Sequence, residues 1–276
     1  MVASAVGISR KNIYRHRLLP RKDKQLVEDI NQAHILNPAY GQYKMALHLG
    51  INHKRAERVM KLYGIKAPRR KAKKHFCTVS VFNHHYTNLI ANILPEQFTP
   101  HLIWVCDVSY FKYQGQFWYL ATIEDLATRQ ILASKVGKYH NADLILAVIK
   151  QAIITTGRVP KYFHTDQGKE FMAREVTGYL ESRGVMVSVS AKASPWQNGY
   201  KESFFGHFKD EFGDINRFDT AGELIEEIYS QIRYYNFDRI HRTLKMSPVN
   251  YTQLNFPEYC RYIRIRNAPP LINNSF

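Results

Sequence analysis

The 276-residue chain has few cysteines, few acidic residues in its first quarter and no long apolar run. Its three cysteines, Cys77, Cys106 and Cys260, are widely spaced and form no Cys-x-x-Cys pair, which argues against a disulfide framework and a zinc knuckle. No stretch approaches roughly eighteen consecutive apolar residues, and the first residues lack the apolar segment of a secretory signal. We therefore expect a protein of the reducing cytoplasm that neither crosses a membrane nor is exported.

The scarcity of acidic residues near the N-terminus makes the chain strongly basic there. Residues 1–75 hold 18 of the 39 lysines and arginines but only 4 of the 23 aspartates and glutamates, so most of the net charge of +16 comes from this segment. A concentrated positive field binds polyanions because counterions are released. Nucleic acid is therefore the favoured partner, and RNA and anionic lipid remain alternatives to DNA.

Residues 22–67 show the pattern of a small helical domain, between a basic segment at 1–21 and a basic linker at 68–98. A short helix at 42–49 stops at Gly50, and Asn52 caps a second helix that runs to Gly64. This layout predicts a helix-turn-helix DNA-binding domain. The candidate DNA-contacting residues are the basic side chains of the second helix and the linker: Lys54, Arg55, Arg58, Lys61, Arg69, Arg70 and Lys71. The alternative is that these charges only solvate a surface helix.

From about residue 99 the pattern changes to strands, and helices then alternate with strands. Strands are predicted at 102–111, 117–125, 130–136, 159–164 and 185–190, and helices at 142–156, 170–182 and 197–212. The order βββαβαβα joins an antiparallel hairpin to a parallel crossover part, which is the order of ribonuclease H. The fold class is therefore α/β, with a ribonuclease H-like core of five mixed strands over residues 99–213.

A helical extension is predicted over residues 214–276. Thr220 and Glu223 form a capping box, and apolar residues then recur on one face of a helix up to Tyr235. Beyond that helix Pro248 and the later prolines predict an irregular tail.

Three acidic residues stand at strand ends and loops, where α/β sheets carry active groups. Asp107 lies within the first strand, where a charge among apolar neighbours is costly unless it is paired or binds a metal. Asp166 ends the fourth strand, and Glu202 follows at the start of the last core helix. Each also has an ordinary interpretation, as a salt-bridged residue, a turn residue or a helix-dipole acid. His164 alternates to the same side as Asp166, and we expect it to have a supporting or structural role.

Carboxylates without nearby cysteine or paired histidine suit Mg²⁺ or Mn²⁺ better than zinc. Two such ions, about 3.5–4 Å apart, would activate the attacking oxygen and stabilise the leaving oxygen of a phosphodiester displacement. Lys209 lies seven residues after Glu202 on the same helical face. We expect it either to contact DNA or to pair with Asp210 or Glu211.

The three acids and Lys209 together resemble the DDE core of retroviral integrases and insertion-sequence transposases. In this chain 35 residues separate Asp166 from Glu202. The more specific resemblance is to OrfB, the catalytic product of the IS-three family of bacterial insertion sequences. AsnHisLysArgAlaGluArgValMetLysLeuTyrGlyIleLys at 52–66 resembles its helix-turn-helix segment. TyrTyrAsnPheAspArgIleHisArgThrLeu at 234–244 resembles its C-terminal Tyr-Asn-x-x-Arg-x-His signature. The similarity covers residues 22 to about 251.

This resemblance implies a transposase that nicks the ends of its element and joins the freed 3′-hydroxyl to DNA, with two Mg²⁺ or Mn²⁺ ions held by Asp107, Asp166 and Glu202. It implies double-stranded DNA as partner, both terminal repeats and target, and a homo-multimer that holds two ends. It also implies an upstream-frame OrfA partner or fusion and a place at the bacterial nucleoid. Two alternatives stay open: a catalytically idle DNA-binding regulator or domesticated transposase, and a nuclease of RNA–DNA hybrids.

Overall fold

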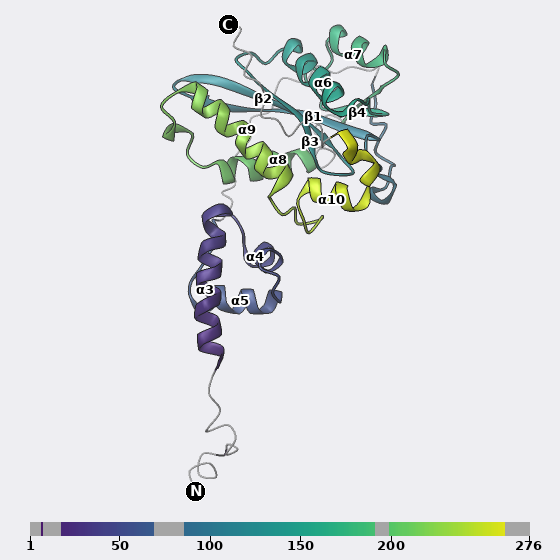
Figure 1. The fold of residues 1–276 in the computed structure, drawn as a ribbon. Helices are drawn as coiled ribbons and strands as arrows, with labels where there is room; N and C mark the ends of the chain where they lie inside the picture. The colour runs from purple at the N-terminus through teal and green to yellow at the C-terminus, as the bar shows by residue number, and fades with distance from the viewer. Residues whose placement is uncertain (1–6, 8–17, 69–85, 191–198, 263–276) are drawn as a thin grey trace. The chain divides into compact units, whose positions relative to one another are not determined.

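A computed structural model describes residues 7, 18–68, 86–190 and 199–262, except for the side chains of 18–21, 199–202 and 260–262. The chain divides into two compact units between Arg69 and Arg70. Over its described residues 18–68 the first unit contains three helices, and we refer to this part as the three-helix unit. The second unit contains a sheet with helices on both of its faces (Figure 1).

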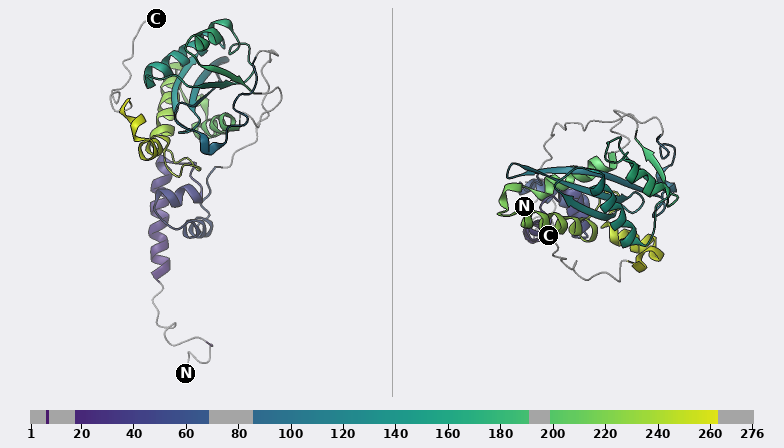
Figure 2. Two further views of the ribbon diagram at one scale, coloured as in Figure 1. Left: turned by 90° about the vertical axis from the view of Figure 1, so that its right-hand side faces the viewer. Right: turned by 90° about the horizontal axis from the view of Figure 1, so that it is seen from above.

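The described part of the first unit, residues 18–68, consists of one long helix and two short ones, and Figure 2 shows it in two further views. The helices are α3 (Leu18–Leu36), α4 (Gln42–His48) and α5 (His53–Leu62). Both predicted short helices are present, and the side chain of Asn52 caps α5 by accepting a 2.9 Å hydrogen bond from the backbone of Lys54. Gly50 has φ of 62°, which suits glycine in the turn between them. The long helix begins at Leu18, within the segment that the sequence analysis assigned to residues 1–21.

The second unit is organised around a mixed sheet in the order β3-β2-β1-β4-β5. Its strands are β1 (Ile103–Tyr113), β2 (Gln116–Asp125), β3 (Ile131–Gly137), β4 (Tyr162–Thr165) and β5 (Met186–Val189). The first three pair antiparallel, whereas β1 with β4 and β4 with β5 pair parallel. The predicted ribonuclease H-like class is confirmed.

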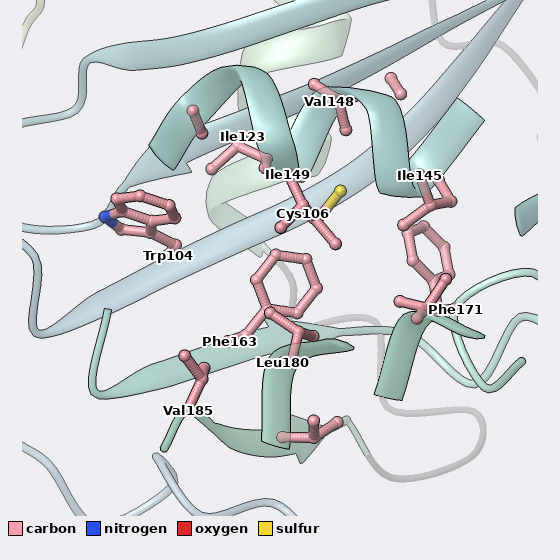
Figure 3. Close-up of a cluster of buried hydrophobic side chains, with 14 of the residues drawn as sticks. Trp104, Cys106, Ile123, Ile145, Val148, Ile149, Phe163, Phe171, Leu180 and Val185 are labelled. Carbon is pink, nitrogen blue, oxygen red and sulfur yellow. The ribbon is translucent and has the colours of Figure 1, made fainter. Parts of the chain in front are cut away.

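Helices cover both faces of this sheet. The helices are α6 (Ala142–Thr156), α7 (Arg174–Glu181), α8 (Gly199–Phe212), α9 (Ala221–Phe237) and α10 (Pro248–Asn255), with short 3-10 turns at Pro95–Gln97, Ile215–Arg217 and Pro257–Tyr262. Between the sheet and α6 and α7 lies a largely aliphatic core, into which Trp104, Cys106 and Phe163 also pack (Figure 3). A second core, rich in phenylalanine, lies between the sheet and α8 and α9. The sheet is therefore the middle layer of three.

Three predictions about the elements need correction. The fourth strand starts at Tyr162 instead of residue 159, because Pro160 has no N–H to donate to a sheet. Helix α7 starts at Arg174 instead of residue 170, because the chain after Asp166 forms a turn-rich loop first. The region after Pro248 is also not wholly irregular. Pro248 is the first residue of α10, where its missing N–H costs no hydrogen bond, and Ser247 caps the helix.

Over the part of the chain that is described, no helix is long and apolar enough to cross a membrane.

Candidate active site

Asp107 lies on β1, and Asp166 directly follows the neighbouring parallel strand β4. The pairing of β1 with β4 runs to Val105 opposite His164, and each aspartate is the second residue beyond that pair. Neighbouring strands lie about 4.8 Å apart, so the register brings the two backbones side by side where β4 ends. This is the carboxyl end of the parallel part of the sheet, the usual position for ligands in α/β folds.

The side chain of Asp107 belongs to the face that α8 and α9 cover. β1 pairs with β2 without a bulge from Trp104 to Tyr113, so its side chains alternate strictly between faces. Phe111, four residues on, is buried in the phenylalanine-rich core, whereas Cys106 is buried against the opposite helices. Asp107 is half-buried, and its Oδ1 accepts a 2.8 Å hydrogen bond from the backbone N–H of Val108.

The C-terminal half of α8 packs on the far end of β1. The ring centroids of Phe208 and Phe212 lie 6.1 and 5.7 Å from that of Phe111. The chain stays there after the helix, because the Tyr113 hydroxyl donates a 3.0 Å hydrogen bond to the carbonyl of Phe218. These contacts place the C-terminal end of α8 against the end of β1.

Glu202 lies in the first turn of α8, and its side chain falls outside the described part of the chain. The six residues from Phe208 back to Glu202 cover about 9 Å of helix. The four residues from Phe111 back to Asp107 cover about 13 Å of strand. The axial distance from Phe208 to Glu202 is therefore of the same order as the strand distance from Phe111 to Asp107.

Asp166 begins a tight loop. Its Oδ1 accepts a 2.9 Å hydrogen bond from the backbone N–H of Gly168. Partial burial raises the pKa of Asp166, the negative charge of Glu170 raises it further, and the Gly168 hydrogen bond opposes both effects. Burial makes the charged form costly here, which a nearby cation would offset.

Glu170 and His140 form a buried pair behind this loop, which the sequence analysis missed. The carboxylate oxygen Oε1 of Glu170 lies 2.9 Å from Nε2 of His140; the Glu170 side chain is 2% exposed and that of His140 is 22% exposed. The ring of Tyr119 stacks on His140 at a centroid distance of 5.2 Å. Pattern reasoning missed Glu170 because it predicted a helix start there, where an acidic residue needs no further explanation.

His164 is enclosed between β4 and β5. Its Nδ1 lies 2.9 Å from the hydroxyl of Ser188, and burial lowers its pKa to about 4, so the ring is neutral at physiological pH. Nearby, the buried atoms Thr165 Oγ1, Gln167 Oε1 and Glu170 Oε2 have no hydrogen-bond partner among the described residues. The loop after β4 therefore has an unusual concentration of unsatisfied oxygen atoms.

Lys209 lies against the end of β1. Its ammonium nitrogen lies 5.0 Å from the centroid of the Tyr110 ring and 5.5 Å from that of Phe111. The carboxylate of Glu211, one of its two expected partners, is engaged by Arg239 instead. The side chain of Lys209 on α8 therefore lies against β1, the strand that carries Asp107.

The basic residues of α5 divide into two groups. Arg58 forms two hydrogen bonds, of 2.7 and 2.8 Å, with the buried carboxylate of Asp23 on α3, and Arg55 donates to the carbonyl of Lys22 at 3.2 Å. These two arginines therefore hold α5 against α3. Lys54 and Lys61 are exposed. Arg69, Arg70 and Lys71 lie outside the described residues.

Among the side chains that are described, no group of three or more histidines, cysteines or acids is arranged to hold a metal ion. The candidate site rests on Asp107 and Asp166 together with Glu202, whose side chain is outside that set.

Two family models match this region, both described as an integrase core domain, at residues 99–195 and 183–248. An uncharacterized transposase-like protein of Haemophilus influenzae is 32% identical over 213 residues, which are 76% of this chain and 96% of the relative. The transposase for the insertion element IS904 of Lactococcus lactis is 29% identical over 74% of this chain and 81% of its own length. Among solved structures, the HTLV-2 integrase catalytic core domain in complex with magnesium is 19% identical, with a TM-score of 0.47 over 55% of this chain and 96% of that one.

The integrase core defines the class of protein as the DDE integrase superfamily. Within that superfamily, the chain belongs to the insertion-sequence transposases and is a DNA transposase. The alternative of a catalytically idle regulator is not favoured by these relatives.

Proposed function

We propose that this transposase cleaves the ends of its insertion element and joins the freed 3′-hydroxyl to target DNA, with Asp107, Asp166 and Glu202 as its catalytic carboxylates. The observation that carries the proposal is the parallel register of β1 and β4, which sets the two aspartates side by side. Glu202 is assigned as the third member because it lies in the first turn of α8, whose C-terminal half packs on the strand that carries Asp107. The integrase core match over the same residues agrees with this assignment.

The donor atoms fit a hard divalent cation. Carboxylate oxygens are the ligands that Mg²⁺ and Mn²⁺ prefer, and the loop after β4 adds buried oxygens without partners, among them Gln167 Oε1. Asp107, Asp166 and Glu202 would hold two such ions. Bound there, the ions would supply Lewis-acid activation of the attacking oxygen and stabilisation of the leaving oxygen.

The protein's own groups position the reacting DNA. The rigid strands fix Asp107 and Asp166, and the aromatic packing of α8 fixes the helix that carries Glu202. Lys209, held over Tyr110 and Phe111, is placed to bind a phosphate of the DNA beside the carboxylates. His164, neutral and hydrogen-bonded to Ser188, acts in support of the strands instead of transferring protons.

The three-helix unit binds double-stranded DNA through the exposed lysines of α5, with the basic linker tracking the backbone. Its helix-turn-helix layout and the positive charge of residues 1–75 support this role. Since transposition requires two ends to be held at once, the working form is a multimer on DNA at the bacterial nucleoid. An upstream OrfA product is its expected partner or fusion.

The decisive experiment incubates the full chain and Mg²⁺ with labelled DNA that carries the element's terminal repeat and scores nicked and joined products. Asp107→Asn is expected to abolish cleavage and joining while DNA binding stays nearly unchanged, because the change removes a ligand charge and leaves the three-helix unit intact. Glu226→Gln, an exposed acid on α9, is the matched control and is expected to stay fully active.

Each alternative gives a different result. Equal strand transfer by Asp107→Asn contradicts the catalytic assignment. Hydrolysis without joining by the wild-type chain favours the nuclease, and binding without any product favours the idle regulator.

A further inference from the structure

The C-terminal end of α9 attaches to α8 and to β3 through three separate contacts. All three come from the short segment Tyr235–Arg239, which lies within the Tyr-Asn-x-x-Arg-x-His signature. The integrase core model places this segment inside its match but assigns it no role.

The first contact is a buried ion pair between Arg239 and Glu211 of α8. Nε of Arg239 lies 2.9 and 2.7 Å from the two carboxylate oxygens of Glu211, and Nη2 lies 2.6 Å from Oε1. The two side chains are only 4% and 8% exposed. A forked pair of this kind fixes both the distance and the orientation of the two groups.

The other two contacts complete the clamp. The ring of Tyr235 meets that of Phe204 on α8 edge-to-face, with centroids 4.9 Å apart. The side-chain amide of Asn236 exchanges two hydrogen bonds with the backbone of Ile131 on β3, of 2.9 and 2.8 Å. One end of α9 therefore ties α8 to the sheet.

The ion pair stands at the back of the candidate catalytic helix. Glu211 follows Glu202 by nine residues, which is two and a half helical turns, so the two positions lie on opposite sides of α8. Hydrogen bonds of an ion pair are directional, whereas apolar burial is not, so the pair adds a constraint on rotation to the phenylalanine packing of α8. A rotation by one residue would turn Glu202 through about 100°.

We infer that Arg239 and Glu211 are positioning residues that set the rotation and axial register of α8 and thereby aim Glu202 at the metal site. The inference rests on the proposed function, because it assigns its purpose through Glu202. It gives the C-terminal signature a role in the chemistry without any contact with the reacting atoms.

A double variant separates positioning from simple stabilisation. Breaking a buried ion pair from one side leaves an uncompensated charge, whereas replacing both partners with apolar residues is often neutral for stability. Arg239→Met with Glu211→Leu in the full chain is therefore expected to unfold close to the wild-type temperature. Strand transfer is nevertheless expected to fall at least ten-fold, and the backbone amides of residues 203–212 to exchange hydrogen at least ten-fold faster.

Arg239→Lys is a second variant, which keeps the positive charge and loses only the forked hydrogen bonds to Glu211. Strand transfer should again fall and amide exchange should again speed up, each by less than in the double variant. Glu227→Gln is the control, because it breaks an ion pair with Arg217 whose side chains are 38% and 45% exposed, and it keeps the Arg217 guanidinium that lies over the Phe212 ring of α8. It should change neither readout. If the double variant or Arg239→Lys transfers strands and exchanges its amide hydrogens at the wild-type rates, the inference is overturned.

Glu202→Gln distinguishes this failure from a failure of the proposed function. That variant should lose strand transfer while amide exchange in α8 stays at the wild-type rate. If Glu202→Gln remains active, the catalytic assignment fails, and the exchange rates of the Arg239 variants still report whether the clamp holds the helix.

Discussion

At the scale of single residues, the candidate site and the three-helix unit both depend on charges whose partners lie far away in sequence. Asp23 and Arg58 are 35 positions apart and form a bidentate pair. Arg58 is basic and lies on the predicted recognition helix, so the sequence pattern favoured a phosphate contact. The structure shows that much of its hydrogen-bonding capacity is used within the unit.

The Asp23–Arg58 pair makes the three-helix unit sensitive to acid. The hydrogen bonds from Arg58 hold the pKa of Asp23 below its ordinary value. The stability that this pair contributes is therefore present above the pKa of the unfolded chain and lost as pH falls through the lower folded pKa, below about pH 4. Amide exchange across residues 18–68, corrected for intrinsic rates, should show this loss in the wild-type chain. Asp23→Asn should show lower amide protection at pH 6 and no further loss of protection as the pH falls below about 4. If protection in the variant and in the wild-type chain depends on pH in the same way, the argument is contradicted.

Gly168 is predicted to be required by the carboxylates on either side of it. A Cβ at this position would collide with the Glu170 carboxylate and lie 3.1 Å from Oδ1 of Asp166. Glu170 is buried against His140 and cannot move without exposing or unpairing its charge, so Gly168→Ala should destabilise the core by about 1–3 kcal/mol. Urea unfolding of the core measures this.

Gly178→Ala is the matched control for this substitution. Gly178 lies within α7, and an added Cβ meets nothing within 4 Å. The change is expected to stabilise the core by about 0.5–1 kcal/mol, because alanine loses less conformational entropy in a helix. An equal effect of the two substitutions would show that the Glu170 carboxylate is not confined.

At the scale of elements, capping and periodicity explain most of what could be predicted. Asn52, Asn141 and Thr220 each cap the helix that follows them, as short polar side chains do. The start of α7 and the existence of α10 could not be predicted from the sequence. Glu170 is compatible with a helix start and with a loop, and Pro248 is compatible with an irregular segment and with the first residue of a helix. Their tertiary environments, a buried histidine partner and a packed helix start, decided between those structures.

Helix α5 offers a test of DNA binding that leaves its packing intact. In the double variant Lys54→Ala with Lys61→Ala, the slope of log affinity against log salt concentration, which is negative, should become shallower. The change should be about 0.9 for each phosphate that the protein no longer neutralises. Stability should hardly change, since neither lysine joins α5 to α3. The control is Lys24→Ala, an exposed lysine on α3. If the slope of the α5 variant equals that of the wild-type chain, Lys54 and Lys61 do not contact DNA phosphates and only solvate the helix surface.

At the scale of the whole molecule, charge and chemistry are separated along the chain. The basic excess belongs to the first 75 residues, whereas the candidate acids lie between 107 and 202. This separation favours a division of labour in which one part concentrates DNA and the other acts on it. The boundaries assigned to these parts remain a prediction of the sequence analysis.

The sequence by itself determined the order of the strands and helices and the class of the core, because apolar periodicity and caps act over a few residues. It also determined the order of Asp107, Asp166 and Glu202 along the chain. Only the tertiary structure decided which charges meet: Arg58 with Asp23, His140 with Glu170 and Arg239 with Glu211. Each pair joins elements separated by 28 or more positions, and local propensity carries no information about which distant element packs against a given face.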